Sequence, residues 1–202
     1  MPDGDLFEAL KSGDASIKTD HIDSFVPEGI KLTSGDVLEA DLVVTATGLD
    51  LQLFGGMSVF IDDEERTAKD WVTYKGLMFS GVPNFANVFG YTNASWTLKA
   101  DLTCQYVCRV LNHMDQTKAD YCVPRLTDDV EVNDMQPLAS GYFARAIDKL
   151  PREGSKLPWQ QHHDYFADMK LLREGALDDG ALQFERCIPT AQPDVVDTLA
   201  AE

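Results

Sequence analysis

Residues 77–114 read LMFSGVPNFANVFGYTNASWTLKADLTCQYVCRVLNHM, and this stretch determines the fold that we expect. Residues 77–80 form a short apolar run that ends in Gly81-Val82-Pro83-Asn84, a sequence typical of a turn. A second apolar run, residues 85–89, stops at Gly90. The stretch therefore predicts a strand, a tight turn, a second strand and, after a short polar loop, a long helix.

We expect this helix to begin near Thr92 or Asn93, because either side chain can accept a hydrogen bond from a free N–H of the first turn. Apolar residues then recur at the spacing of one helix face. They are Leu98, Leu102, Thr103, Tyr106, Val107, Val110, Leu111 and Met114. A strand that leads into a helix N-terminus directs free N–H groups and the positive end of the helix dipole at one place. The electron-rich edge of a cofactor fits such a place.

The string GYTNASWTLKADL, residues 90–102, together with Gly81-Val82-Pro83-Asn84, resembles a part of a known enzyme family. That part is the carboxyl-terminal portion of FAD-dependent, NADPH-using monooxygenases of the Baeyer–Villiger and flavin-containing group. The string is long and unusual, and the similarity extends more loosely over nearly the whole chain.

The resemblance implies FAD and NADPH as cofactors and a small organic molecule as substrate. In that family NADPH reduces FAD, and oxygen from a flavin C4a-peroxide is inserted into a ketone or oxidises a soft heteroatom. The residues implied to bind the cofactors lie around the helix start and at an earlier strand end. They are Tyr91, Asn93, Ala94, Ser95, Trp96 and Thr97, with Thr47 and Gly48 where the two cofactors approach each other. Trp96 has an alternative interpretation, as a core anchor of its helix, and no catalytic residue is identified.

The first forty-eight residues predict one short helix and several strands. Residues 5–11 favour a helix that stops at Gly13, and residues 16–22 alternate like a half-buried strand. Residues 29–33 and 37–40 flank Ser34-Gly35-Asp36 and predict a hairpin.

Residues 42–45 are apolar or β-branched without alternation, which indicates a strand buried on both faces, as in a parallel sheet. Gly48 at its end lets the backbone approach a ligand or another segment closely. This hairpin, strand and Ala-Thr-Gly sequence resembles the segment that closes the nicotinamide domain in two-dinucleotide flavoproteins.

Later segments predict further local structure. Residues 62–65 are acidic and favour a solvated turn. The remaining expectations are a loop at 120–124, a helix at 140–150, an exposed basic linker at 151–158, a helix at 158–173, a strand-like piece within 178–184 and disorder over the last fifteen or so residues.

Composition limits the class of protein. The 202 residues suffice for one domain with a real core, and 17 basic against 34 acidic side chains give a net charge of −17. This charge excludes nucleic acid as an expected partner, because such binding needs clustered Lys and Arg. No apolar run approaches the roughly 20 residues of a membrane span, and the first residues do not resemble a secretory signal.

The chain has four cysteines, and their spacing predicts no metal site. Cys104 and Cys108 lie one helical turn apart and can form half a site with His113, but small core hydrophobes are the usual role of such residues. The adjacent His162 and His163 point to different helix faces and so do not share a metal. A reduced, cytoplasmic protein is expected.

The glycine turns that hold the two nucleotides in this family are missing. No two glycines are separated by a single residue, so no Gly-x-Gly-x-x-Gly sequence exists. We therefore expect an α/β chain with an incomplete two-dinucleotide-binding, Rossmann-like flavoprotein fold. Residues 1–48 would end the NADPH domain, residues 49–118 would be the returning half of the FAD domain, and residues 119–202 a carboxyl-terminal helical extension.

Two alternatives remain open. The chain can be a truncated or split gene product without independent catalysis, which acts only with a polypeptide carrying the missing amino-terminal half. Strands without their neighbours would then expose unpaired edges and promote self-association. A disulfide reductase is disfavoured, because the only close pair, Cys104 and Cys108, lies inside a helix.

Overall fold

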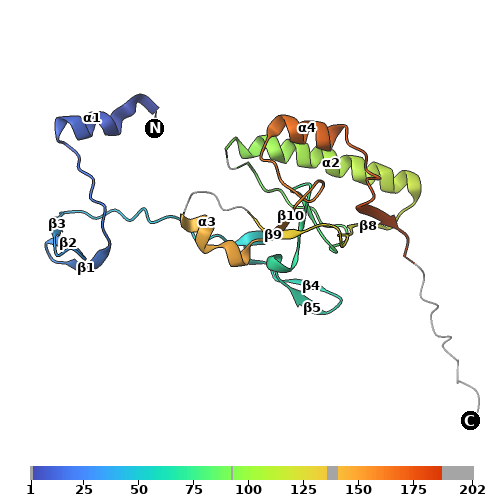
Figure 1. The fold of residues 1–202 in the computed structure, drawn as a ribbon, viewed down its shortest axis with the longest axis horizontal. Coiled ribbons are helices and arrows are strands. Elements are labelled where there is room, and N and C mark those ends of the chain that lie inside the picture. Colours follow the sequence, from blue (N-terminus) through green and yellow to red (C-terminus); the bar gives the residue numbers. More distant parts are fainter. Residues whose placement is uncertain (1, 92, 136–140, 188–202) are drawn as a thin grey trace, which may run out of the picture. The chain divides into compact units, whose positions relative to one another are not determined.

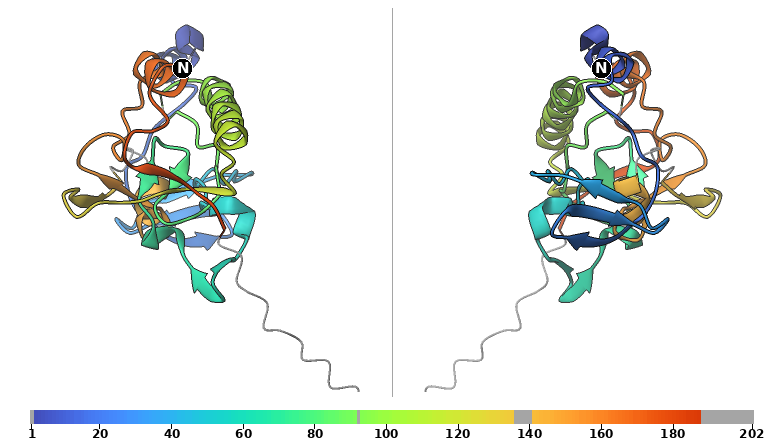
Figure 2. Two further views of the ribbon diagram at one scale, coloured as in Figure 1. Left: turned by 90° about the vertical axis from the view of Figure 1, so that its right-hand side faces the viewer. Right: turned by 90° about the vertical axis from the view of Figure 1, so that its left-hand side faces the viewer.

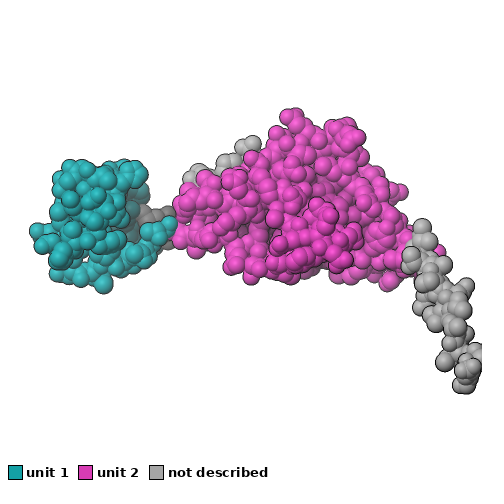
Figure 3. Space-filling model, turned by 90° about the horizontal axis from the view of Figure 1, so that it is seen from below, with its two compact units in different colours: residues 1–47 teal, residues 48–202 magenta. Residues whose placement is uncertain are grey.

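The computed structural model describes residues 2–91, 93–135 and 141–187. The chain forms two compact units, residues 1–47 and 48–202 (Figure 3). The three-part domain division stays a prediction.

The first unit contains one helix and one small sheet. A 3₁₀ turn, Pro2–Gly4, leads into α1, Asp5–Ser12. The strands β1 (Ile22–Val26), β2 (Gly29–Leu32) and β3 (Val37–Glu39) form an antiparallel sheet in sequence order. The predicted first helix, its stop at the left-handed Gly13 and the predicted hairpin are therefore confirmed.

Two predicted strands of this unit are wrong. The strand expected at 16–22 begins only at Ile22, because from there on the backbone finds its partner in β2. The segment 42–45 forms no strand, and Leu42 and Val44 are 80% and 78% exposed. A strand buried on both faces needs neighbours, and the described residues provide none beside this segment.

The second unit is built from two-stranded antiparallel sheets (Figure 1). The pairs are β4 (Val59–Ile61) with β5 (Glu64–Arg66), β6 (Thr73–Tyr74) with β7 (Met78–Phe79), β8 (Tyr121–Pro124) with β11 (Leu182–Glu185), and β9 (Val132–Asp134) with β10 (Arg152–Gly154). The α/β class is thus confirmed. No parallel sheet occurs among the described residues, so the Rossmann-like part of the prediction remains a proposal.

The helices of this unit lie after and between these strands. They are α2 (Trp96–Thr117), α3 (Gly141–Arg145) and α4 (Tyr165–Arg173), with 3₁₀ turns at Leu53–Gly56, Ala68–Asp70 and Ile147–Lys149. Helix α4 packs alongside α2, as the views in Figures 1 and 2 show. Its start is later than the predicted 158, because the Asp164 side chain accepts a hydrogen bond from the Ala167 N–H and caps the helix there.

The main core joins α2, α4 and three of the sheets. Its buried residues are Val72, Tyr74, Leu77, Met78, Leu102, Tyr106, Val110, Cys122, Val130, Trp159, Leu172, Ala181 and Leu182. Of the predicted apolar face of α2, Leu102, Thr103, Tyr106 and Val110 are buried and Val107 and Met114 are half-buried, whereas Leu98 and Leu111 are exposed. Cys104 and Cys108 are also exposed, so their expected role as core hydrophobes is wrong.

Four further segment predictions can be compared with the structure. Residues 85–89 form no ladder, because Asn87 N–H donates to the Leu77 carbonyl and no neighbouring strand lies beside them in the described part of the chain. The predicted loop at 120–124 contains β8, and the predicted linker at 151–158 contains β10; both pair with distant strands that sequence order does not reveal. The acidic residues 62–65 form the exposed turn of the β4–β5 hairpin, as predicted. The expected disorder at the end falls on residues 188–202, which lie outside the described residues.

No helix in the described ranges is long and apolar enough to cross a membrane.

Candidate functional site

The first turn of α2 is exposed and lacks a side-chain cap. Ser95 precedes the helix, and its hydroxyl pairs with that of Thr97 at 2.8 Å rather than with a backbone N–H. Residues 93–98 are all exposed. The prediction of Asn93 as the cap is wrong, since the chain needs the residues up to Ser95 to turn from the buried Tyr91 into the helix; Thr92 lies outside the described residues. The free N–H groups of this turn can donate hydrogen bonds to an electron-rich group, which the positive helix end also attracts.

Trp96 offers a flat aromatic surface at this turn. Its side chain is 57% exposed, so its interpretation as a core anchor is wrong. One face of the indole lies over Gly90, where a Cβ would meet the ring at 2.1–2.6 Å, and its centroid is 5.6 Å from that of Phe89. The absence of a side chain at Gly90 therefore sets where Trp96 lies.

Tyr91 has a different environment from the residues that follow it. It is buried, and its hydroxyl donates to Asp168 Oδ2 at 2.7 Å. Lys99 Nζ donates to the same oxygen at 2.7 Å and lies 5.6 Å from the centroid of the Tyr91 ring. Burial, followed by the contact with Asp168, raises the pKa of the Tyr91 phenol. Tyr91 and Lys99 thus join the start of α2 to α4.

A small cavity lies beside this cluster. It measures about 10 Å³. Its lining includes Tyr91, Lys99 and Asp168 of this cluster, together with Lys75, Gly90, Gln161 and His163. This space holds about one water molecule. Burial lowers the pKa of the His163 imidazole. The cavity is too small for an organic substrate.

Thr47 and Gly48 stand at the division between the two units. Both are exposed, and Gly48 has φ of 95°, which favours glycine. A Cβ at Gly48 would lie at an ordinary 3.6 Å from an Arg145 nitrogen, within the second unit. The structure groups residues 93–97 at one helix end, whereas Thr47 and Gly48 lie at the division between the units.

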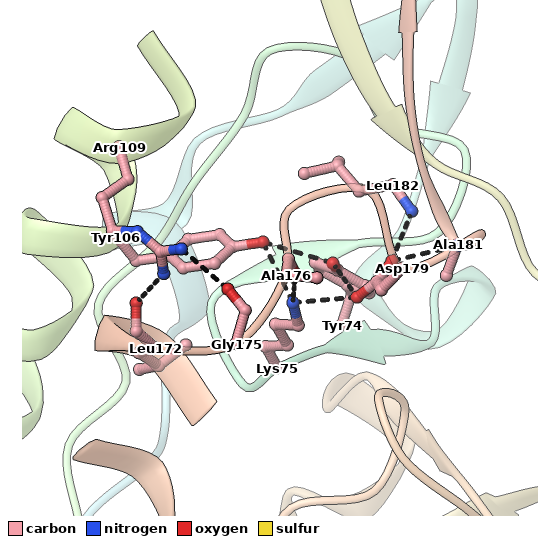
Figure 4. A network of polar contacts seen from close by, with 10 residues as sticks. All are labelled: Tyr74, Lys75, Tyr106, Arg109, Leu172, Gly175, Ala176, Asp179, Ala181 and Leu182. Carbon is pink, nitrogen blue, oxygen red and sulfur yellow. Dashed lines mark hydrogen bonds and ion pairs between the residues drawn. The ribbon is translucent and has the colours of Figure 1, made fainter. Parts of the chain in front are cut away.

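A second buried polar cluster surrounds Lys75 (Figure 4). Its ammonium group, with a side chain 1% exposed, pairs with Asp179 at 2.8 Å and lies 5.0 Å from the ring centroids of Tyr74 and Tyr106. Tyr74 donates to Asp179 at 2.6 Å.

The charges of Lys75 and Asp179 are compensated by their contact with each other and by the hydrogen bond from Tyr74. Burial opposes ionisation of Asp179, but hydrogen bonds from Lys75 and Tyr74 outweigh it and lower the pKa of the carboxyl. Burial also lowers the pKa of Lys75. Together, these contacts fasten the segment before β11 to the core.

Sequence reasoning missed most of these two clusters. Lys75 stands alone in the apolar run WVTYKGLMF, a position that invites a search for a buried partner, and Asp179 belongs to the Asp-Gly-x-Leu pattern near the end of the chain. Nothing in the sequence pairs Asp168 with Tyr91, 77 residues away. Among the described residues, no group of three or more His, Cys, Asp or Glu side chains is arranged to hold a metal ion.

The start of α2 thus combines an exposed, uncapped first turn that carries an indole with the buried contacts of Tyr91 and Lys99 to Asp168. Comparison with known proteins defines the class of protein: over 91–95% of its length the chain is similar to the carboxyl-terminal part of FAD-containing monooxygenases, at 44–48% identity.

Three relatives illustrate the similarity. The chain is 48% identical over 186 residues to the FAD-containing monooxygenase EthA of Mycolicibacterium smegmatis. The matched region covers 92% of this chain and 38% of EthA. It is 44% identical over 188 residues to the probable FAD-binding monooxygenase AlmA of an Acinetobacter species, with the same coverage. It is 45% identical over 186 residues to the putative FAD-containing monooxygenase MymA of Mycobacterium tuberculosis, covering 91% of this chain and 38% of that protein.

The chain thus spans less than two-fifths of the length of these curated relatives. The resemblance predicted from the sequence is confirmed, and the relatives are enzymes. No known protein-family profile matches the chain. No solved structure matches it either.

Proposed function

We propose that the chain forms the carboxyl-terminal portion of a flavin monooxygenase, in which residues 93–97 line one edge of FAD. The observation that carries this proposal is the exposed, uncapped start of α2 with Trp96 beside it. Helix N–H groups there suit the electron-rich pyrimidine edge of a flavin, and the indole supplies a flat contact surface. Thr47 and Gly48 are proposed to lie near NADPH on the basis of the family resemblance alone.

When bound, FAD reduced by NADPH would supply the oxygen chemistry, with a ketone or a soft heteroatom as the acceptor. The chain's own residues would orient the flavin and stabilise negative charge on it through the helix end. The particular reaction, the small organic substrate, NADPH as reductant, the Rossmann-like completion of the fold and the cytoplasmic location are parts of this proposal.

A flavin titration tests the proposed contact. FAD fluorescence is followed with the wild-type chain, with Trp96→Ala and with Phe60→Ala, which removes an aromatic ring of similar exposure on β4. We expect saturable binding that is weakened about tenfold or more by Trp96→Ala and unchanged by Phe60→Ala. Equal affinity for all three proteins would overturn the placement of the flavin.

The alternative, a chain that acts only with a partner polypeptide, is favoured by a specific surface. An apolar face on the outer side of α2, which we call the α2 outer face, consists of Cys104, Val107, Cys108 and Leu111. It continues into an apolar groove of about 250 Å³ that Phe85 and Ala86 also line. Residues 85–89 run beside this groove without a strand partner in the described part of the chain. An exposed apolar helix face that continues into an apolar groove is typical of a surface that another polypeptide covers.

We propose that this face packs against a polypeptide equivalent to the remaining three-fifths or so of the relatives. Thiol alkylation tests it, because Cys104 and Cys108 lie on the face, Cys187 is exposed outside it and Cys122 is buried. The chain is co-expressed with the portion of the M. smegmatis relative outside the match. In the complex we expect Cys104 and Cys108 to be protected while Cys187 still reacts.

A matched pair of variants sharpens this test. Leu111→Lys places a charge on the α2 outer face and should prevent the complex, whereas Phe166→Lys charges an equally apolar, exposed position on α4 and should not. A complex in which Cys104 and Cys108 remain as reactive as before would contradict the proposed interface. The FAD titration repeated on the complex then separates a chain that binds flavin alone from one that needs its partner.

A further inference from the structure

One carboxylate oxygen binds two residues on either side of the exposed segment 93–98, which contains most of the first turn of α2. Tyr91 precedes this turn and Lys99 closes it, and both donate to Asp168 Oδ2 at 2.7 Å. Asp168 comes from α4, so the contact spans 77 and 69 residues of sequence. The described residues between the two donors, 93–98, are exposed, whereas the donors and the acceptor are buried.

Burial of this cluster makes the geometry of its hydrogen bonds well defined. With side chains of Lys99 and Asp168 only 7% and 9% exposed, water does not compete well for the pair, so its geometry is fixed more tightly than that of a surface ion pair. Removal of either partner would leave a buried charge or phenol unsatisfied. The neighbouring cavity holds about one water, so an organic molecule does not fit in it beside the cluster.

We propose that Asp168 is a positioning residue that acts through Tyr91 and Lys99 to hold the first turn of α2, and with it Trp96, in the orientation that the flavin contacts. The expected effect of Asp168 on FAD binding rests on the proposed function. Control of the α2 start by α4 is independent of FAD. It assigns the carboxyl-terminal segment a role in the cofactor site without direct contact with the cofactor.

The chain offers a matched control for this proposal. In the Lys75–Asp179 pair the lysine is also buried, while the Asp179 side chain is 19% exposed; the two are joined at 2.8 Å and fasten a neighbouring carboxyl-terminal segment to the core. Asp179 bonds with Tyr74, Lys75 and the N–H groups of Ala181 and Leu182, all outside the first turn of α2. Asp179→Asn therefore makes the same chemical change as Asp168→Asn without touching that turn.

Trp96 provides the readout, because Trp71 and Trp159 are buried while Trp96 is exposed. Acrylamide quenching of tryptophan fluorescence is measured for wild type, Asp168→Asn, Tyr91→Phe and Asp179→Asn. Each protein is paired with its Trp96→Phe version to isolate the Trp96 signal. Tyr91→Phe removes only the hydroxyl and preserves the ring, so it tests the proposal even if Asp168→Asn fails to fold.

We expect Asp168→Asn and Tyr91→Phe to change Trp96 quenching by about twofold, and Asp179→Asn to lower the melting temperature without this change. In the complex that binds FAD, Asp168→Asn should weaken FAD at least tenfold and Asp179→Asn should not. A Trp96 signal unaltered by both Asp168→Asn and Tyr91→Phe, or altered as much by Asp179→Asn, would overturn the proposal. If Trp96 responds as expected but the wild-type complex binds no FAD, the positioning role stands and the proposed function fails.

Discussion

At the scale of single residues, identity matters most where the sequence motif meets a distant side chain. Gly90 leaves room for the Trp96 indole, and Tyr91 turns the other way into the interior to reach Asp168. Two adjacent residues of one motif therefore make different contacts, one with the exposed indole and one with a buried carboxylate. The motif predicts that both matter, and the structure separates their roles.

Gly90→Ala should displace the indole at little cost in stability. The added Cβ would lie 2.1 Å from the Trp96 ring, but the indole is more than half exposed and can swing outward. We expect a change in unfolding free energy below about 1 kcal/mol, with altered Trp96 fluorescence and weaker FAD binding. Urea denaturation and acrylamide quenching measure the two effects.

Gly141→Ala is the control, since its Cβ would meet only an Arg145 side chain at 3.4 Å and its φ is not in the left-handed region. Identical Trp96 quenching in Gly90→Ala and wild type would show that Gly90 does not set the position of the indole.

At the scale of elements, α4 is held on α2 by polar contacts of unequal value. Arg109 on α2 donates to the carbonyls of Leu172 and Gly175, at 2.5 and 2.7 Å, and so satisfies the C-terminal end of α4. Arg173 on α4 reaches Gln105 and Asp101 of α2 at the surface. Both arginines link the same two helices, but only Arg109 binds partly buried carbonyl acceptors that a helix end leaves without partners.

Arg109→Lys should destabilise the second unit by about 1–3 kcal/mol, because a single ammonium group cannot reproduce the two-pronged contact. Arg173→Lys should cost less than about 1 kcal/mol, as exposed pairs do. Chemical denaturation compares the two variants, and hydrogen exchange of the α4 amides locates the effect. Equal losses in both would contradict the assigned difference.

At the scale of the whole molecule, three buried phenols link stability to alkaline pH. Burial raises the pKa of Tyr74, Tyr91 and Tyr106 above the ordinary value of 10.0. In the unfolded chain these phenols lose their protons near pH 10, whereas in the folded chain they keep them. The folded state therefore binds more protons above that pH, and stability falls as pH rises.

We expect the unfolding free energy to decrease steadily from about pH 10 upward, measured by urea denaturation at pH steps between about 8 and 12. Burial lowers the pKa of Lys75, so this group makes the unfolding free energy rise with pH below about pH 10. The pH range of the lysine effect therefore differs from that of the phenols. Tyr91→Phe should reduce the alkaline slope. A flat profile above pH 10, with tyrosinate absorbance appearing for every phenol in the folded chain, would contradict this account.

The uncovered α2 outer face also predicts self-association of the isolated chain. Sedimentation at increasing concentration should show species larger than the monomer, and Leu111→Lys should reduce them more than Phe166→Lys. A single monomer boundary at every concentration would count against it.

The local elements with their own signals were predictable from the sequence. Turn residues and alternation indicated the β2–β3 hairpin, apolar periodicity indicated α2, and the unusual string at 90–102 indicated the relatives. Predictions failed where structure depends on a neighbour: residues 42–45 and 85–89 are apolar like strands but form none, and β8 and β10 exist only through their pairing with β11 and β9.

The sequence by itself thus determined the family resemblance, the short hairpins and the long helix, because each depends on residues close together in the chain. Only the tertiary structure decided that Tyr91 and Lys99 meet Asp168, that Lys75 meets Asp179, and that Trp96 faces outward. The physical reason is that a buried charge is stable only beside a partner, and its partner lies up to 104 residues away, from Lys75 to Asp179. No local pattern specifies which distant carboxylate that will be.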